Sequence, residues 1–252
     1  MEEYHVYPER TYKETKAINS STNLAIFKVY LWFALGLLIT GVVSLTIPNL
    51  LIALIETSED PNAIATGYII AMVISVVLMI PAAIVMAVQS FRRNFPLMLV
   101  TYILYSVAMG VLLSSIMLNF VGSGSQGIYT ICTAFFATGS IFLIMGLLTA
   151  FPKINFHAFI PIITTLAIGA LTISLVNFFL GSAMIYWIVE FVIFGIMIIV
   201  VGIDTYNIKK IAERGGFDNP NLALYCAFSL YTDFIWIFIR ILYYLMIFSR
   251  RN

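Results

Sequence analysis

Residues 184–206 read MIYWIVEFVIFGIMIIVVGIDTY, and this stretch decides the class of the protein. Its only charged side chains are Glu190 and Asp204. A helix crosses the hydrocarbon core of a bilayer with about 20 predominantly apolar residues. The stretch is therefore long and apolar enough to form a transmembrane helix that carries two acids.

The rest of the chain has the same character. Of its 252 residues, 62% are hydrophobic and 10% are charged, whereas a soluble domain carries about 25% charged residues. No water-soluble fold could bury this much apolar surface, so we expect an all-α integral membrane protein surrounded by lipid. The net charge of +1 gives no reason to expect a nucleic-acid partner.

Seven apolar stretches are each long enough to cross, and short connections with breakers such as Pro48 join them. We expect spans at residues 24–47, 66–90, 96–120, 127–150, 157–180, 184–206 and 222–248. No connection is long enough to separate two domains. Residues 24–252 should therefore form one seven-helix domain behind a polar segment of residues 1–23.

Lysine and arginine indicate the orientation of the chain in the membrane. Most of them lie in the N-terminal segment and in the second, fourth and sixth connections, whereas the first connection carries only acids. The N-terminus is therefore expected in the cytoplasm. With seven spans, Arg250 and Arg251 at the C-terminus face outward against this rule, unless the last segment does not cross fully.

Two aspartates, Asp204 and Asp233, are expected close together in the last two spans. Counted at 1.5 Å per residue from the cytoplasmic side, Asp204 lies about 7–8 Å deep and Asp233 about 16 Å deep. Their helices are joined by a short connection, so the carboxyl groups can meet. Alternatively, Asp204 lies at the membrane interface and caps the end of its helix.

Two carboxyl groups in contact share a proton and titrate as a unit. With one proton, Asp204 and Asp233 would clasp the two helices by a hydrogen bond. Fully ionised, they would repel each other or bind Ca²⁺, which prefers carboxylate oxygens. No other cofactor is expected. Arg92 or Arg93, at the end of the second span, could reach the pair or could simply set topology.

Glu190 and Arg240 are the other charges inside the spans. Arg240 lies two turns beyond Asp233 on the same helix face, and Glu190 lies toward the outer end of the preceding span. They would line a cation route or pair with each other. The alternatives are an interfacial position for Glu190 and contact with the outer headgroups for Arg240.

The chain resembles the Bax inhibitor-1 family, also called the transmembrane BAX inhibitor motif family. Residues 202–209, GIDTYNIK, are similar to its sixth-span motif, and residues 224–235, LYCAFSLYTDFI, to its seventh-span motif. Residues 28–32, KVYLW, and 176–182, VNFFLGS, resemble bacterial members, which suggests a bacterial inner membrane.

The resemblance implies six helices around a central C-terminal helix. It also implies a pH-sensitive calcium leak gated by Asp204 and Asp233, with Arg92, or alternatively Arg93, as a latch. The pore lining departs from the family pattern. Trp236 and Arg240 stand where members often carry asparagine; other members carry arginine in place of Tyr243 and glutamate in place of Pro81.

Two other functions fit the same features. A proton-coupled cation exchanger would use the same aspartates but would depend on the proton gradient. A non-transporting regulator of a protease or a cell-death pathway would use the polar residues 1–20 to bind a partner, whose identity the sequence does not indicate. An enzyme is not expected. A serine nucleophile in residues 122–125, GSGS, would need a base, but His5 and His157 lie on the other side of the membrane, and the run is typical of a loop.

Overall fold

The computed structural model describes residues 8–92, 94–121, 125–151 and 154–249. Within these ranges the chain forms seven long helices and two short 3-10 helices. They are α1 (Pro8–Thr57), α2 (Pro61–Gln89), α3 (Phe95–Val121), α4 (Ser125–Ala150), η1 (Phe156–Phe159), α5 (Ile160–Leu180), α6 (Ala183–Glu213), η2 (Gly216–Asp218) and α7 (Pro220–Ser249). Each long helix is apolar and long enough to span a bilayer. The expected all-α membrane class with seven spans is confirmed.

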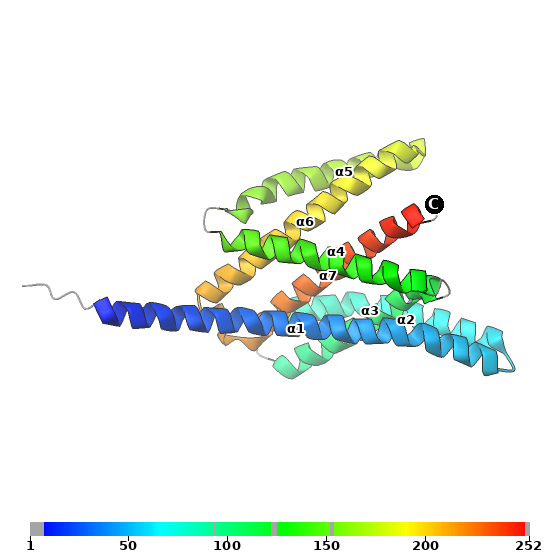
Figure 1. Ribbon diagram of the computed structural model, residues 1–252, viewed down its shortest axis with the longest axis horizontal. Helices are drawn as coiled ribbons and strands as arrows, with labels where there is room; N and C mark the ends of the chain where they lie inside the picture. The colour runs from blue at the N-terminus through cyan, green and yellow to red at the C-terminus, as the bar shows by residue number, and fades with distance from the viewer. Residues whose placement is uncertain (1–7, 93, 122–124, 152–153, 250–252) are drawn as a thin grey trace, which may run out of the picture.

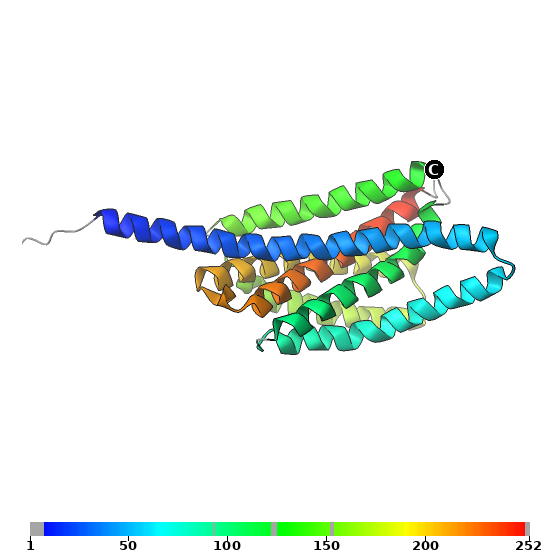
Figure 2. The same cartoon turned by 90° about the horizontal axis from the view of Figure 1, so that it is seen from below.

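Consecutive long helices run in opposite directions, so their connections alternate between the two ends of the bundle (Figure 1). One end holds the α2–α3, α4–α5 and α6–α7 connections. We call it the basic end, because Lys209, Lys210 and Arg214 lie there. The first turns of α1 extend beyond the other helices at this end, and α7 finishes at the opposite end (Figure 2).

Helix α1 differs most from its expected boundaries. It begins at Pro8, inside the segment expected to precede the domain, and continues through Pro48 to Thr57. Proline lacks an N–H group and usually kinks or ends a helix. Here Pro48 is buried, and α1 packs extensively along α3, so tertiary packing outweighs the local preference. Pro81 likewise lies inside α2.

The core lies around α7 and α3, the two most buried of the spanning helices. Helix α7 packs against α1, α2, α3, α4 and α6, whereas α5 packs mainly against α6 and η1. The expected ring of six helices around a central α7 is therefore not confirmed. Helix α5 lies at the edge of the bundle beside α6 (Figure 1).

Buried hydrogen bonds join α1, α3 and α7 in this core. The Thr40 hydroxyl donates to the carbonyl of Ser106 at 2.9 Å, and its oxygen lies 2.6 Å from the Tyr231 hydroxyl. The Tyr102 hydroxyl donates to the carbonyl of Trp32 at 2.8 Å. An unpaired polar group costs several kcal/mol inside a membrane, so these bonds fix how the three helices meet.

Replacing Gly36 of α1 with alanine should destabilise this junction. An added Cβ atom would lie 2.0 Å from the Tyr102 hydroxyl oxygen and 3.1 Å from the Tyr231 ring. Overpacking of this kind costs about 1–3 kcal/mol, so Gly36→Ala should lower the melting temperature in detergent. Gly41→Ala is the matched control in the same helix, because nothing lies within 4 Å of its added Cβ. Equal melting temperatures for the two variants would contradict this account of the core.

Candidate functional site

A cavity of about 440 Å³ opens at the basic end between α6, α7 and the connection that precedes α5. Basic side chains, among them Lys210 and Arg214, line it near the end of α6, and Asp204 and Ser229 line it further along their helices. Asp204 precedes the last residue of α6 by nine positions, which is about 13 Å along the helix. The cavity therefore connects the basic end with an acid inside the span.

Ser229 of α7 joins the two helices at this depth, because its hydroxyl donates a hydrogen bond to Asp204 Oδ2. Asp233 lies one turn further along the same face of α7. Its Oδ2 atom is buried and has no hydrogen-bond partner in the described part of the chain. Among the described residues, the carboxyl groups of Asp204 and Asp233 share no direct hydrogen bond.

Apolar side chains close the space beyond the acidic pair. Val201, one turn from Asp204 on α6, and Ile237, one turn from Asp233 on α7, are both 0% exposed. They belong to one apolar cluster with Met145 of α4. The cavity thus ends near the aspartates in this conformation, and an apolar layer separates them from the opposite end.

An ion pair between α6 and α7 lies on the far side of this layer. Arg240 Nη1 donates to Glu190 Oε2, and the two side chains are 22% and 12% exposed respectively. Arg240 therefore pairs with Glu190, one of the placements considered from the sequence. It also lines a second cavity of about 360 Å³, whose walls include Trp236 and Tyr243, two of the positions that depart from the family pattern.

The Arg92 side chain is exposed, and in the described residues it forms no hydrogen bond or ion pair. Its backbone carbonyl instead accepts a hydrogen bond from Asn221 Nδ2 at 2.6 Å, and the same amide donates to the carbonyl of Gln89 at 2.9 Å. The first turn of α7 thus binds the α2–α3 connection. The latch role of Arg92 stays a prediction, and Arg93 lies outside the described residues.

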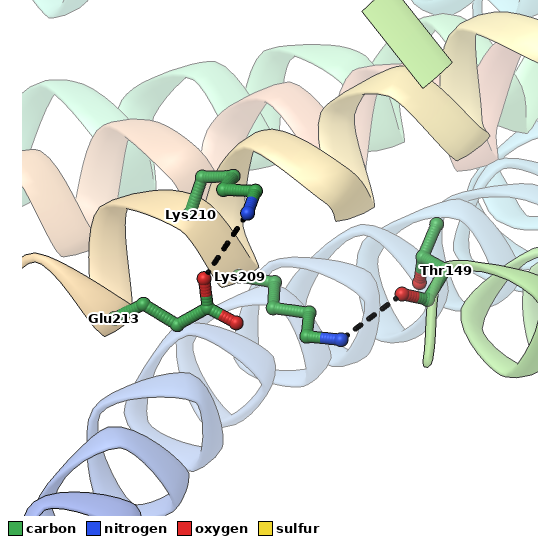
Figure 3. Close-up of polar contacts among 4 residues, drawn as sticks. All are labelled: Thr149, Lys209, Lys210 and Glu213. Atoms are coloured by element: carbon green, nitrogen blue, oxygen red, sulfur yellow. Dashed lines mark hydrogen bonds and ion pairs between the residues drawn. The ribbon is translucent and has the colours of Figure 1, made fainter. Parts of the chain in front are cut away.

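Two consecutive lysines near the end of α6 point to different sides of the helix (Figure 3). Lys209 donates to the carbonyl of Thr149, near the end of α4, at 3.2 Å. Lys210 lies 3.4 Å from Glu213 on α6 itself. Only Lys210 of the two lines the cavity that leads to Asp204.

The acidic pair offers only a small set of oxygen ligands for a metal ion. Among the described residues there is no group of three or more His, Cys, Asp or Glu side chains that could hold a metal. Calcium takes six to eight oxygen ligands. Asp204, Asp233 and the Ser229 hydroxyl would supply only some of them, so water would complete the shell of an ion bound here.

These features define an all-α membrane protein in which Asp204 lines the inner part of a cavity between the last two helices, and a buried carboxyl oxygen of a second aspartate, Asp233, lies one turn beyond Ser229. The model of the family described as "Inhibitor of apoptosis-promoting Bax1" matches residues 22–250. The chain belongs to this family, and the resemblance found in its sequence motifs is confirmed.

Several bacterial proteins are similar over much of their length. The chain is 30% identical to "Inner membrane protein YbhL" of Escherichia coli (strain K12) over 222 residues, which cover 85% of this chain and 88% of that protein. It is 25% identical to "Uncharacterized protein RP147" of Rickettsia prowazekii (strain Madrid E) over 244 residues, covering 93% and 94%. No solved structure matches the chain. The name of the first relative supports a location in the bacterial inner membrane.

Proposed function

We propose that the protein is a pH-sensitive cation leak that passes Ca²⁺, and that Asp204 and Asp233 are its gate. One observation carries the proposal: a buried carboxyl oxygen of Asp233, with no hydrogen-bond partner in the described part of the chain, lies one turn beyond Ser229, which holds Asp204 where the cavity meets the apolar layer. An isolated carboxylate is costly in such surroundings, so the pair favours holding a proton while the layer is closed.

The gate would work through repulsion between its two acids. While a proton is held, Ser229 keeps Asp204 attached to α7, and Val201 and Ile237 stay packed. When both acids ionise, their charges repel, α6 and α7 separate, and the apolar layer opens. The freed carboxylates then offer oxygen ligands to Ca²⁺. The leak should therefore open as pH rises and shut as pH falls.

The proposal places the basic end in the cytoplasm, in accordance with the positive-inside rule. The cavity with Asp204 would then be open to the cytoplasm, and the gate would respond to cytoplasmic pH. The ion pair of Glu190 and Arg240 would lie toward the outer surface.

Calcium entry into vesicles that contain the purified protein tests the function. The pH is set equal inside and outside and is varied from acid to alkaline, with protein-free vesicles as the control. We expect entry that exceeds the control and increases with pH. Entry that is indistinguishable from the control, or that is the same at every pH, would count against the leak.

A proton-coupled exchanger is the second candidate, because a closed apolar layer between Asp204, which lines the cavity, and the distant Glu190–Arg240 ion pair also suits alternating access. The two functions differ in what drives calcium. A leak passes calcium down its own gradient at equal pH on both sides, whereas an exchanger moves it against that gradient when a proton gradient is imposed. Uphill movement in the same vesicles would favour the exchanger.

Ser229→Ala should shift the pH at which the leak opens. The Ser229 hydroxyl holds Asp204 to α7 only while the gate is closed, and a hydrogen bond to a charged group contributes about 1.5–3 kcal/mol. Without it, the closed state is less stable, so half-maximal opening should move about one to two pH units downward. Ser229→Thr retains a hydroxyl and should keep the parental midpoint. A parental midpoint for Ser229→Ala would show that this bond has no part in gating.

A further inference from the structure

The mouth of the cavity that leads to Asp204 carries positive charge, which repels a cation on its way to that acid. Lys210, Arg214 and His157 line it, while Asp204, the one acid among the described residues that line the cavity, lies further inside. Arg214 forms no side-chain hydrogen bond or ion pair within the described ranges of the chain. A cation that approaches Asp204 from the basic end must therefore pass an unopposed positive charge.

Neighbouring groups offset this charge only weakly. Glu213 lies 3.4 Å from Lys210, but both side chains are 42% exposed, and exposed ion pairs are weak. The Lys210 ammonium also lies over the Tyr206 ring, 5.5 Å from its centre. His157 is held by Asn207 at 2.6 Å. Lys209 does not add to this charge, because it points toward Thr149 of α4 (Figure 3). The mouth is thus preorganised and remains basic.

The surroundings of the mouth fit the headgroup level of a bilayer. Tyr206 and Tyr225 line the cavity, and tyrosines gather at membrane–water interfaces because one end of the ring is apolar and the other polar. Basic pockets between transmembrane helices bind anionic headgroups on the cytoplasmic side. A volume of about 440 Å³ is within the range of small-ligand sites.

We propose that this mouth binds the phosphate of an anionic ligand, with Arg214 and Lys210 as its contacts and His157 on the facing wall. The phosphate could come from an acidic phospholipid headgroup or from solution. A guanidinium can bind two phosphate oxygens at once. A bound phosphate cancels the positive charge at the mouth and raises the local concentration of cations in front of Asp204. Occupancy therefore increases the leak, and this last step rests on the proposed function.

Thermal unfolding of the full chain in neutral detergent tests binding without any flux. Short-chain phosphatidylglycerol and inorganic phosphate are titrated separately, since a ligand that binds only the folded state raises the melting temperature. Each basic side chain that contacts an anionic headgroup increases the affinity about five-fold. The double variant Lys210→Gln/Arg214→Gln should thus bind about thirty-fold more weakly. Lys28→Gln should match the parent, because Lys28 lines a different cavity.

Comparison of the two titrations identifies the source of the phosphate. Stabilisation by phosphatidylglycerol but not by inorganic phosphate assigns the site to a lipid, and stabilisation by both assigns it to the phosphate group alone. The proposal is overturned if neither ligand stabilises the parent, or if the parent and the double variant are stabilised equally.

Flux separates this site from the gate. In vesicles that contain phosphatidylglycerol the parental leak should exceed that in pure phosphatidylcholine vesicles, and the double variant should lose this difference. If the binding difference is found but calcium entry never depends on pH, the proposed leak fails and the anion site stands. If the leak is pH-gated but the double variant binds as the parent does, the anion site is wrong and the leak stands.

Discussion

Asp233→Asn should hold the calcium leak at its low, acid-pH level at every pH. An amide cannot ionise, so Asp204 would lose its proton beside a neutral neighbour while Ser229 still holds it to α7. Two carboxylates that face each other across a helix interface repel by about 3 kcal/mol at an effective dielectric of about 20. That repulsion energy corresponds to about a hundredfold change in the open population. Asp233→Asn removes the repulsion and should therefore lose this increase in the open population.

Calcium entry into vesicles at matched acid and alkaline pH measures this effect. Asp218→Asn is the control, because it makes the same acid-to-amide change in η2, outside the cavity that leads to Asp204. The control should keep the alkaline increase that Asp233→Asn loses. An Asp233→Asn variant that still opens at alkaline pH would show that repulsion within the pair does not drive opening.

Arg240→Met should destabilise the folded protein by up to about 3–5 kcal/mol, the cost of removing one partner from a buried ion pair, because the Glu190–Arg240 pair is largely enclosed inside the membrane. The Glu190 side chain is 12% exposed. On the same helix, the rings of Trp187 and Phe191 both pack against the ring of Tyr244 of α7. Without Arg240, a charged Glu190 would have no cation beside it in these surroundings. Unfolding in detergent, followed by loss of helical signal, measures the cost.

Two further variants show whether burial is the cause. Glu190→Gln/Arg240→Met removes both charges and should regain most of the lost stability, because a buried pair contributes little beyond a neutral replacement. Lys210→Met breaks an exposed pair with Glu213 and should cost no more than about 1 kcal/mol. If Arg240→Met were as mild as Lys210→Met, the Glu190–Arg240 pair would not be desolvated in the membrane.

Span lengths and charge gaps were enough to predict the number and order of the helices. Residues 184–206 lie within α6, and four of the other six expected spans fall inside a single helix, whereas 66–90 runs one residue past α2 and 157–180 begins in η1 before α5. The ends of α1 could not be predicted, because Pro48 is a local breaker whose effect is outweighed by packing against α3, distant in sequence. The edge position of α5 is also a tertiary property, since its span is as apolar as the others.

The site was partly predictable for similar reasons. Residue counting from the helix ends placed Asp204 and Asp233 within reach of each other. Ser229 was missed, although its position four residues before Asp233 puts it on the same helix face and could have revealed it. The exposure of Arg92 could not be foreseen, because Asn221, far away in sequence, binds the connection that carries it.

The most direct test of the gate is an infrared titration of the protein in vesicles, comparing the parent with Asp233→Asn. The absorption of protonated carboxyl groups inside the membrane should disappear over the same pH range in which calcium entry rises. Asp233→Asn should lack the part of this signal that follows the leak. A signal that persists unchanged while the leak opens, or that is the same in both proteins, would contradict a gate operated by the proton of Asp204 and Asp233.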